Sequence, residues 1–404
     1  MTLDQAPAIT AESAVTGGVQ RKVFLLCALV AFLDGFDTQS IGPAAPAIVA
    51  ALGLKLGEFG SVFSVSQIGF LCGSLAFGAL GDRFGRRRLL AIATIIFALA
   101  SLGTALAGNL TVLLAARLAA GFGLGGATPN FVGLVSEFSP QALRAKRVTI
   151  LWAAVPFGGM AGALASSAAL PTLGWQAMFY LGCAAPLLLV PVLFALLPET
   201  AEAAHEEDGV GIGQLFKGSY LMRTVWLWLA SFMTWTLLVV TAFWTPALLK
   251  QAGFSVSAAA SVLAFSNAGG VIGTLVIGAA IGRRRPFSAL LIAFPVAGAL
   301  TALIGVELSG GSFVLVAATA ALAGFFSSAA GGGIIAVSAS VYPGFMRATG
   351  VGWALGFGRL GSILGPLAVG LLVARSLPVS LIYSCIAITA LAAAGFVALL
   401  ARRA

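Results

Sequence analysis

The stretch Leu33-Asp-Gly-Phe-Asp-Thr-Gln39 lies in the middle of an apolar run that extends from Val23 to Leu54. Its two acids, Asp34 and Asp37, are three residues apart, so on a helix they share one face. Asp34 follows Lys22, the polar edge of the run, by twelve residues. At about 1.5 Å per residue it would lie ~18 Å deep, near the middle of a hydrocarbon layer about 30 Å thick.

Burying a carboxylate at that depth costs about 2.5–3.5 kcal/mol. The two acids must therefore face a polar cavity, hold a proton or meet a cation. We interpret them as functional groups, because ionisable residues inside a membrane usually mark transport pathways and proton relays. The alternative is an ion pair that only joins helices.

The composition is that of a polytopic helical membrane protein. Of 404 residues, 60% are hydrophobic and 9% are charged, which excludes an ordinary soluble globular protein. The first twenty residues lack the features of a cleavable signal peptide, so we expect the first span to stay in the membrane. The apolar runs predict an all-α fold with twelve transmembrane helices, near 23–50, 58–80, 89–107, 110–135, 148–170, 175–197, 223–249, 255–281, 287–307, 312–341, 348–374 and 378–401.

The net charge of +9 indicates topology rather than nucleic-acid binding. Most of the 22 Lys and Arg residues gather at alternate connections between the predicted spans. Because cytoplasmic loops carry the excess of basic residues, both termini are expected in the cytoplasm.

No cofactor or metal site is expected. The four cysteines lie far apart within apolar spans and have neither metal-ligand spacing nor the pattern of a disulfide framework. His205, the single histidine, lies in the acidic stretch 202–208 of the central loop and is interpreted as solvated.

The chain repeats itself at an offset of 200 residues. Pro46 aligns with Pro246, and the same offset joins Gly69, Gly73 and Gly78 to Gly269, Gly273 and Gly278. We therefore expect two pseudo-symmetric six-helix halves, as in carriers that rock around a central site. The predicted parts are a cytoplasmic tail 1–21, a bundle 22–197, a cytoplasmic linker 198–222 and a bundle 223–404.

The repeat makes Gln67 and Asn267 equivalent amides. They line the central cavity or form hydrogen bonds between helices; the sequence leaves both open.

The connection after the second span reads Gly78-Ala-Leu-Gly-Asp-Arg-Phe-Gly-Arg-Arg-Arg88. It resembles the loop signature of the major facilitator superfamily. Asp82 and Arg83 are expected to take part in gating, with Asp82 capping the start of the eleventh span near Arg347 when the carrier is closed inwards. In the second half Gly282 stands at the position equivalent to Asp82. A second helix-capping contact of the same kind, in that half, is therefore in doubt.

The fourth span contains Arg117-Leu-Ala-Ala-Gly-Phe-Gly-Leu-Gly125, which resembles the Arg-then-glycine motif of the same superfamily. Arg117 lies one or two turns from the predicted outer end, so the alternative for this residue is snorkelling to the interface. The span continues with Asn130 and Phe131 and ends at Glu137, near Arg144, Lys146 and Arg147. Glu137 is expected to be a cytoplasmic gate or a loop anchor.

Arg359 is the second cation inside a span. It lies twelve residues past Arg347, at the depth of Asp34, among glycines that leave room for a ligand. Its planar guanidinium can hold a carboxylate through two parallel hydrogen bonds. The alternative is a permanent partnership with Asp34 or Asp37.

A narrower resemblance covers nearly the whole chain. Asp34-Gly-Phe-Asp37, Pro129-Asn130, Pro198-Glu-Thr200 and Arg347-Ala-Thr-Gly-Val-Gly-Trp353 are similar to motifs of the aromatic acid:proton symporter family. The resemblance implies a protein that imports benzoate-like, such as hydroxybenzoate-like, or phenylpropionate-like acids with protons. It also implies functional roles for Asp34, Asp37, Arg117, Glu137, Arg347 and Arg359. We expect the protein to be a monomer in the bacterial inner membrane.

Further residues complete the predicted substrate site. Aromatic side chains that would suit a planar ring are Phe36, Phe131, Trp235, Phe243, Trp244, Phe265, Phe325 and Trp353. Of these we choose Phe36, Phe131 and Trp353, which neighbour the motifs. The predicted polar residues are Arg359, Arg117, Gln39, Asn130, Gln67 and Asn267.

Three other functions are alternatives to this one: an antiporter, a membrane-embedded enzyme and a receptor. A drug:proton antiporter of the same superfamily would have a glycine-rich motif in its fifth span, which residues 156–159 only approximate. An enzyme would need a nucleophile–base or metal constellation, but the spans contain no histidine, and a receptor would need a longer soluble segment. We therefore expect a carrier and not an enzyme.

Overall fold

The computed structural model describes residues 17–199, 211–218, 220–280 and 286–403, and in this part of the chain it contains helices and no strands. The prediction of an all-α fold is confirmed. The long helices are α1 (Gly17–Leu52), α2 (Phe59–Phe84), α3 (Arg86–Ala105), α4 (Leu110–Glu137), α5 (Gln141–Leu173), α6 (Gln176–Leu196), α7 (Tyr220–Gln251), α8 (Val256–Ala280), α9 (Pro286–Glu307), α10 (Phe313–Val341), α11 (Gly344–Ala374) and α12 (Val379–Ala401).

Among the described helices, α2 to α12 are long and apolar enough to cross a membrane. The remaining long helix, α1, carries both aspartates in its middle. Most of the predicted tail and linker, together with Gly282 and Arg283 to Arg285, lie outside the described residues.

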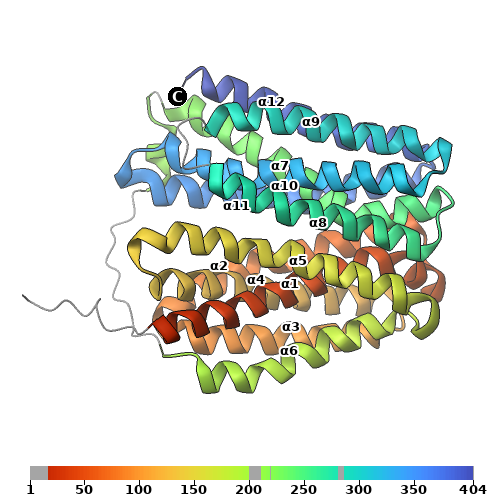
Figure 1. The fold of residues 1–404 in the computed structure, drawn as a ribbon, viewed down its shortest axis with the longest axis horizontal. Helices are drawn as coiled ribbons and strands as arrows, with labels where there is room; N and C mark the ends of the chain where they lie inside the picture. Colours follow the sequence, from red (N-terminus) through yellow and green to blue (C-terminus); the bar gives the residue numbers. More distant parts are fainter. Residues whose placement is uncertain (1–16, 200–210, 219, 281–285, 404) are drawn as a thin grey trace, which may run out of the picture.

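The helices form two groups of six, α1–α6 and α7–α12, which lie side by side (Figure 1). Equivalent helices pack through equivalent glycines. Gly69 lies so close to α4 that an added Cβ would overlap the backbone of Leu118, and Gly269 has the same relation to Ala321 in α10. Small residues let helix backbones approach closely in membranes. The predicted pseudo-symmetry is therefore present in the helix packing.

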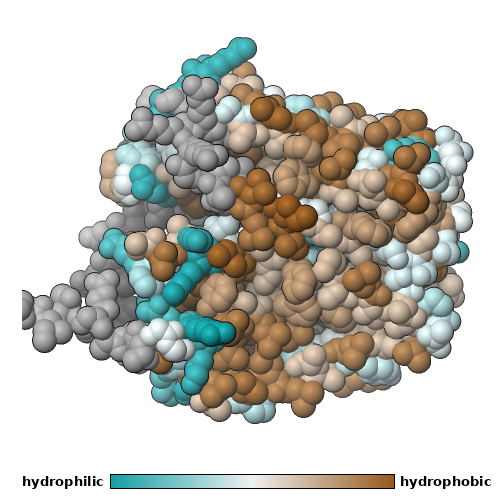
Figure 2. Space-filling model, viewed as in Figure 1, coloured by the Kyte–Doolittle hydropathy of each residue, from teal (hydrophilic) through white to brown (hydrophobic). Residues whose placement is uncertain are grey.

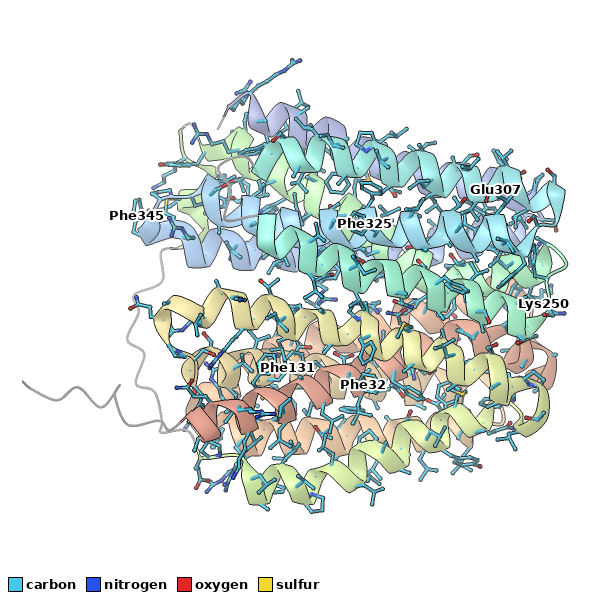
Figure 3. All side chains as sticks on the ribbon, in the orientation of Figure 1. Phe32, Phe131, Lys250, Glu307, Phe325 and Phe345 are labelled. Atoms are coloured by element: carbon cyan, nitrogen blue, oxygen red, sulfur yellow. The ribbon has the colours of Figure 1, made fainter. Side chains whose placement is uncertain are left out.

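The first residue of α1 and the last residue of α12 lie at the same end of the molecule, which we call the termini end (Figure 1). Phe345 also lies there, whereas Lys250 and Glu307 lie at the opposite, far end (Figure 3). Hydrophobic side chains cover most of the visible face between the ends, and hydrophilic ones gather at the termini end (Figure 2). This distribution is that of a membrane-spanning bundle.

The two halves share one hydrophobic core at the far end and have separate cores at the termini end. In the shared core, Phe63 of α2 packs against Phe243 and Trp244 of α7, with ring centroids 5.0 and 5.3 Å apart. Towards the termini end, one core around Phe131 contains only α1–α6, and another around Phe294 contains no residue of those helices. The halves are thus joined at the far end and separate at the other.

Hydrogen bonds reinforce the closed far end. Ser64 of α2 donates to the carbonyl of Ile363 in α11 at 2.6 Å. The hydroxyl of Ser167 in α5 lies 2.7 Å from that of Ser257 and 3.0 Å from that of Ser261, both in α8. Each of these contacts joins one half to the other.

Candidate functional site

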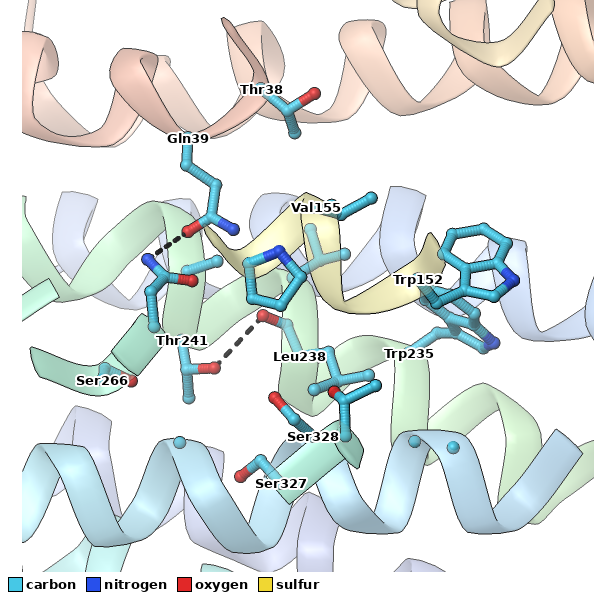
Figure 4. Close-up of a pocket in the computed structure, with 18 of the residues that line it drawn as sticks. Thr38, Gln39, Trp152, Val155, Trp235, Leu238, Thr241, Ser266, Ser327 and Ser328 are labelled. Atoms are coloured by element: carbon cyan, nitrogen blue, oxygen red, sulfur yellow. Dashed lines mark hydrogen bonds between the residues drawn. The ribbon is translucent and has the colours of Figure 1, made fainter. Parts of the chain in front are cut away.

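A cavity of about 370 Å³ lies between the halves, lined by α1, α2 and α5 on one side and by α7, α8, α10 and α11 on the other. The close-up shows side chains from both halves pointing into it, among them Gln39, Trp152 and Trp235 (Figure 4). Its size is within the range of small-molecule sites, about 300–1,000 Å³. The residues that line it come from the middle of the bundle and from the termini side of α5 and α10, where the halves are separate.

Asp34 and Arg359 are the charged residues that line this cavity. The Cζ atom of Arg359 lies 4.2 Å from the ring centroid of Phe70 and 4.3 Å from that of Trp235. Both rings attract the cation through their faces. Within the described part of the chain, no carboxylate oxygen lies within 4.0 Å of its guanidinium. The ion pair with Asp34 or Asp37, which the sequence left open as the alternative for Arg359, is therefore not formed here.

Asp34 lines the same cavity and is 4% exposed. Its Oδ1 accepts a hydrogen bond from the Thr38 hydroxyl at 3.0 Å. Among the described side chains, no cation lies within 4.0 Å of its carboxylate. An ionised carboxylate in such a place is costly. Asp34 is therefore placed to take up a proton or to pair with a cation that approaches through the cavity.

Asp37, one helical turn further along α1, has different surroundings. Arg117 Nη1 of α4 donates to its Oδ2 at 3.2 Å, and the Ser101 hydroxyl of α3 donates to its Oδ1. Both side chains of the ion pair are 1% exposed, and neither residue lines the cavity. Arg117 therefore does not snorkel to the interface. Its charge is compensated inside the first half.

The two equivalent amides both line the cavity. Asn267 Nδ2 donates to Gln39 Oε1 at 2.7 Å and to the carbonyl of Leu263 at 3.1 Å. The bond to Gln39 joins α8 to α1 and is drawn in Figure 4. Asn267 thus combines both roles that the sequence left open, cavity lining and hydrogen bonding between helices.

The three predicted aromatic residues lie outside the cavity lining. Phe131 is fully buried and packs edge-to-face on Trp152, with centroids 6.2 Å apart, so it supports the cavity wall from behind. Trp353 is half exposed and stacks on Trp228. Phe36 is partly buried against the shared core at the far end.

Asn130, a predicted polar site residue, also lies outside the lining. Its Nδ2 donates to the carbonyls of Gly126 at 2.8 Å and Phe77 at 3.4 Å, so its amide is used in packing α4 against α2.

The predicted gating residues lie around the termini end. Glu137 pairs with Arg86, with Nε and Oε1 2.5 Å apart, rather than with the basic residues of α5. Arg83 lies over the Phe84 ring, and Arg347 is exposed. The side chain of Asp82 lies outside the described residues, so the latch between Asp82 and the start of α11 stays a prediction.

Sequence reasoning missed Phe70 and Trp152, and it mentioned Trp235 without choosing it. Phe70 follows Gln67 by three residues, so helix periodicity would have found it. The 200-residue repeat aligns Trp235 with Gly35, inside the stretch between Asp34 and Phe36. No sequence signal marks Ser101 as a partner of Asp37.

Comparison with known proteins gives consistent results. Residues 27–306 match the family model described as Major Facilitator Superfamily. The chain is 36% identical over 350 residues to the 3-(3-hydroxy-phenyl)propionate transporter of Escherichia coli K12, covering 86% of each chain. It is 34% identical over 404 residues to the gallate transporter of Pseudomonas putida, covering 92% of this chain and 90% of that one.

A solved structure with a similar fold is the bacterial homologue of the human lysosomal transporter Spinster, in an inward-facing and occupied conformation. Its TM-score is 0.78 at 19% sequence identity, with 96% of this chain and 98% of that chain covered.

The Asp37–Arg117 pair generates a stability prediction. Asp37→Ala leaves the Arg117 charge buried without its partner, which typically costs about 3–5 kcal/mol. We expect a clearly lower unfolding temperature in detergent, and substantial recovery in Asp37→Ala/Arg117→Met, which removes both charges. Asp34→Ala is the matched control, because Asp34 has no such ion pair, and it should lower the unfolding temperature much less. Equal losses for the two single variants, with no recovery in the double variant, would contradict the assignment.

Proposed function

Because the chain belongs to the Major Facilitator Superfamily, we propose that it is a proton-coupled symporter that imports aromatic carboxylic acids by alternating access. The names of its relatives, a hydroxyphenylpropionate and a gallate transporter, support this substrate class. The proposed site of action is a bacterial inner membrane, in which the protein is a monomer with both termini and the linker 198–222 in the cytoplasm. The basic residues at the connections of the termini end support this orientation.

The observation that carries the proposal is the environment of Arg359. Its guanidinium faces a cavity, lies between two aromatic rings and has no anionic partner within 4.0 Å among the described residues. A monoanionic aromatic acid matches this environment. Its carboxylate meets the fork of guanidinium N–H groups, and its ring lies against an aromatic and apolar wall.

Asp34 supplies the proposed proton site. When ionised it competes with the substrate for the charge of Arg359 across the same cavity. Protonation of Asp34 ends this competition and so favours binding of the substrate carboxylate to Arg359. A carboxylate bound to Arg359 in turn favours protonation of Asp34, so proton and substrate bind cooperatively. Asp37 and Arg117 belong to the same proposed coupling unit, since Asp37 lies one turn from Asp34 and joins α1 to α4.

The two arrangements of hydrophobic core support alternating access. With the termini in the cytoplasm, the shared core closes the outer side and the cavity faces inwards. Bundles 22–197 and 223–404 would rock as bodies, so that the far-end core separates while the termini ends meet. Asp82, Arg83, Glu137 and Arg347 are the proposed gating residues of that closed inner side.

A test of coupling uses Asp34→Asn in vesicles with an imposed pH gradient, acidic outside for inward transport. Wild type should accumulate a labelled benzoate- or phenylpropionate-type acid against its gradient. Asparagine imitates the protonated acid but releases no proton, so the variant should lose accumulation and retain substrate exchange at equal concentrations. Full pH-driven accumulation by Asp34→Asn would remove this residue from coupling. Uptake of the acid into acidic-inside vesicles by wild type, without uptake in the reverse arrangement, would instead support the antiporter, because protons leaving the vesicle would then drive the acid in the opposite direction.

A test of the carboxylate site uses Arg359→Lys and Arg359→Ala. Lysine keeps the charge but loses the bidentate fork. Affinity for the acid should therefore fall at least about tenfold, the loss expected when one hydrogen bond to a charged group is removed. Alanine should leave no measurable binding. Equilibrium binding in detergent measures both. Arg375→Ala is the control, because this exposed arginine ends the same helix without lining the cavity, and wild-type affinity is expected. Unchanged binding by Arg359→Ala would place the carboxylate elsewhere.

A further inference from the structure

Besides the indole Nε1 of Trp235, the cavity wall holds one more buried polar atom without a hydrogen-bond partner among the described residues, and it belongs to the carboxamide of Gln67. The side chain is 5% exposed, and its Oε1 is fully buried without a hydrogen-bond partner among the described residues. Leaving a buried acceptor unpaired is costly, and most such groups in folded proteins are paired. Because Gln67 lines the cavity, its carboxamide borders the space that a ligand would occupy.

The equivalent amide in the other half has its partners. Asn267 donates to both Gln39 and Leu263, so its side chain is fixed by the protein. The repeat thus supplies two amides at corresponding places, of which one connects the halves and the other is left available. The two halves therefore present different polar groups to the cavity, which suits a ligand whose two ends differ.

The segment that carries Gln67 cannot move to find a partner. On either side of Gln67, the carbonyls of Ser66 and Phe70 lie against Gly121 and Gly125 of α4 so closely that a Cβ at either glycine would overlap them. Ser66 is also held by Arg117, whose Nε donates to its hydroxyl at 3.3 Å. The backbone that carries Gln67 is therefore packed in place before any ligand arrives.

The aromatic ring that contacts Arg359 belongs to the same face of α2 as Gln67. Phe70 follows Gln67 by one helical turn, a rise of about 4.5 Å, and its ring contacts Arg359. A planar acid whose carboxylate binds Arg359 extends along the cavity wall that contains the Phe70 ring. We propose that the Gln67 oxygen accepts a hydrogen bond from a hydroxyl group on the substrate ring, so that the carrier selects hydroxylated aromatic acids. This inference rests on the proposed function and specifies its substrate.

A free acceptor distinguishes ligands by whether they carry a donor. A phenolic hydroxyl donates to the oxygen and completes its hydrogen bonding. A methoxy group at the same position has similar polarity but no donor, so it leaves the oxygen unpaired and places a second acceptor beside it. Comparing the two substituents on one skeleton isolates the donor from size and ring electronics.

The experiment measures binding in detergent, at one pH, for benzoate and phenylpropionate skeletons that are unsubstituted, hydroxylated or methoxylated at the 3- or 4-position. For at least one skeleton and position, wild type should bind the hydroxylated acid about tenfold or more tightly than its methoxylated counterpart, as expected for one hydrogen bond and one unpaired acceptor. In Gln67→Met, which keeps an unbranched side chain of similar length without the amide, this ratio should fall to about one.

Gln251→Met is the matched control, because it makes the same chemical change at an exposed residue that ends α7 without lining the cavity, and it should keep the wild-type ratio. Equal binding of hydroxylated and methoxylated acids by wild type overturns the inference without any variant, while leaving the proposed function intact. A ratio that persists in Gln67→Met, or that is lost in Gln251→Met as well, also overturns it. Absence of binding for every acid in wild type would reject the proposed function itself.

Discussion

Removing a charge from water is costly, and this cost determines how the charged residues in the middle of the molecule are arranged. The chain meets it in two ways. Asp37 and Arg117 form a closed pair inside the first half, with Ser101 and Ser66 as further partners. Asp34 and Arg359 face the cavity between the halves and lack ion-pair partners among the described residues. The first pair is a means of holding helices together, whereas the second leaves charges that a proton and an anion can satisfy.

The position of that cavity follows from the distribution of hydrophobic core. Where both halves contribute to one core, Phe63 of α2 packs between the halves against Phe243 and Trp244 of α7. Towards the termini end each half has its own core, so the halves can part without exposing the interior of either. A substrate bound between Arg359 and Gln67 would contact both halves at once, since these residues belong to α11 and α2. Binding energy can therefore couple to the relative position of the halves.

Sequence reasoning predicted the fold well and the site only in part, for physical reasons. The lengths of the apolar runs, the basic residues at the connections and the 200-residue offset are properties of the whole chain. The sequence therefore predicted the transmembrane spans and the symmetry of the two halves. Asp34 and Arg359 were identified from their depth. However, a three-residue spacing could not show that Asp34 faces the cavity while Asp37 faces Arg117, because that depends on the rotation of α1 against α3 and α4. Phe36, Phe131 and Trp353 were chosen by closeness to motifs, whereas the cavity wall is built by Phe70, Trp152 and Trp235 from three different helices.

A structure of the protein with a brominated benzoate bound, in which the anomalous signal of bromine locates the ring, tests the proposed binding site most directly. We expect the carboxylate within hydrogen-bond distance of the Arg359 guanidinium and the ring against the wall formed by Phe70 and Trp235. A carboxylate bound away from Arg359, or a ligand outside the cavity between the halves, would contradict the proposed site.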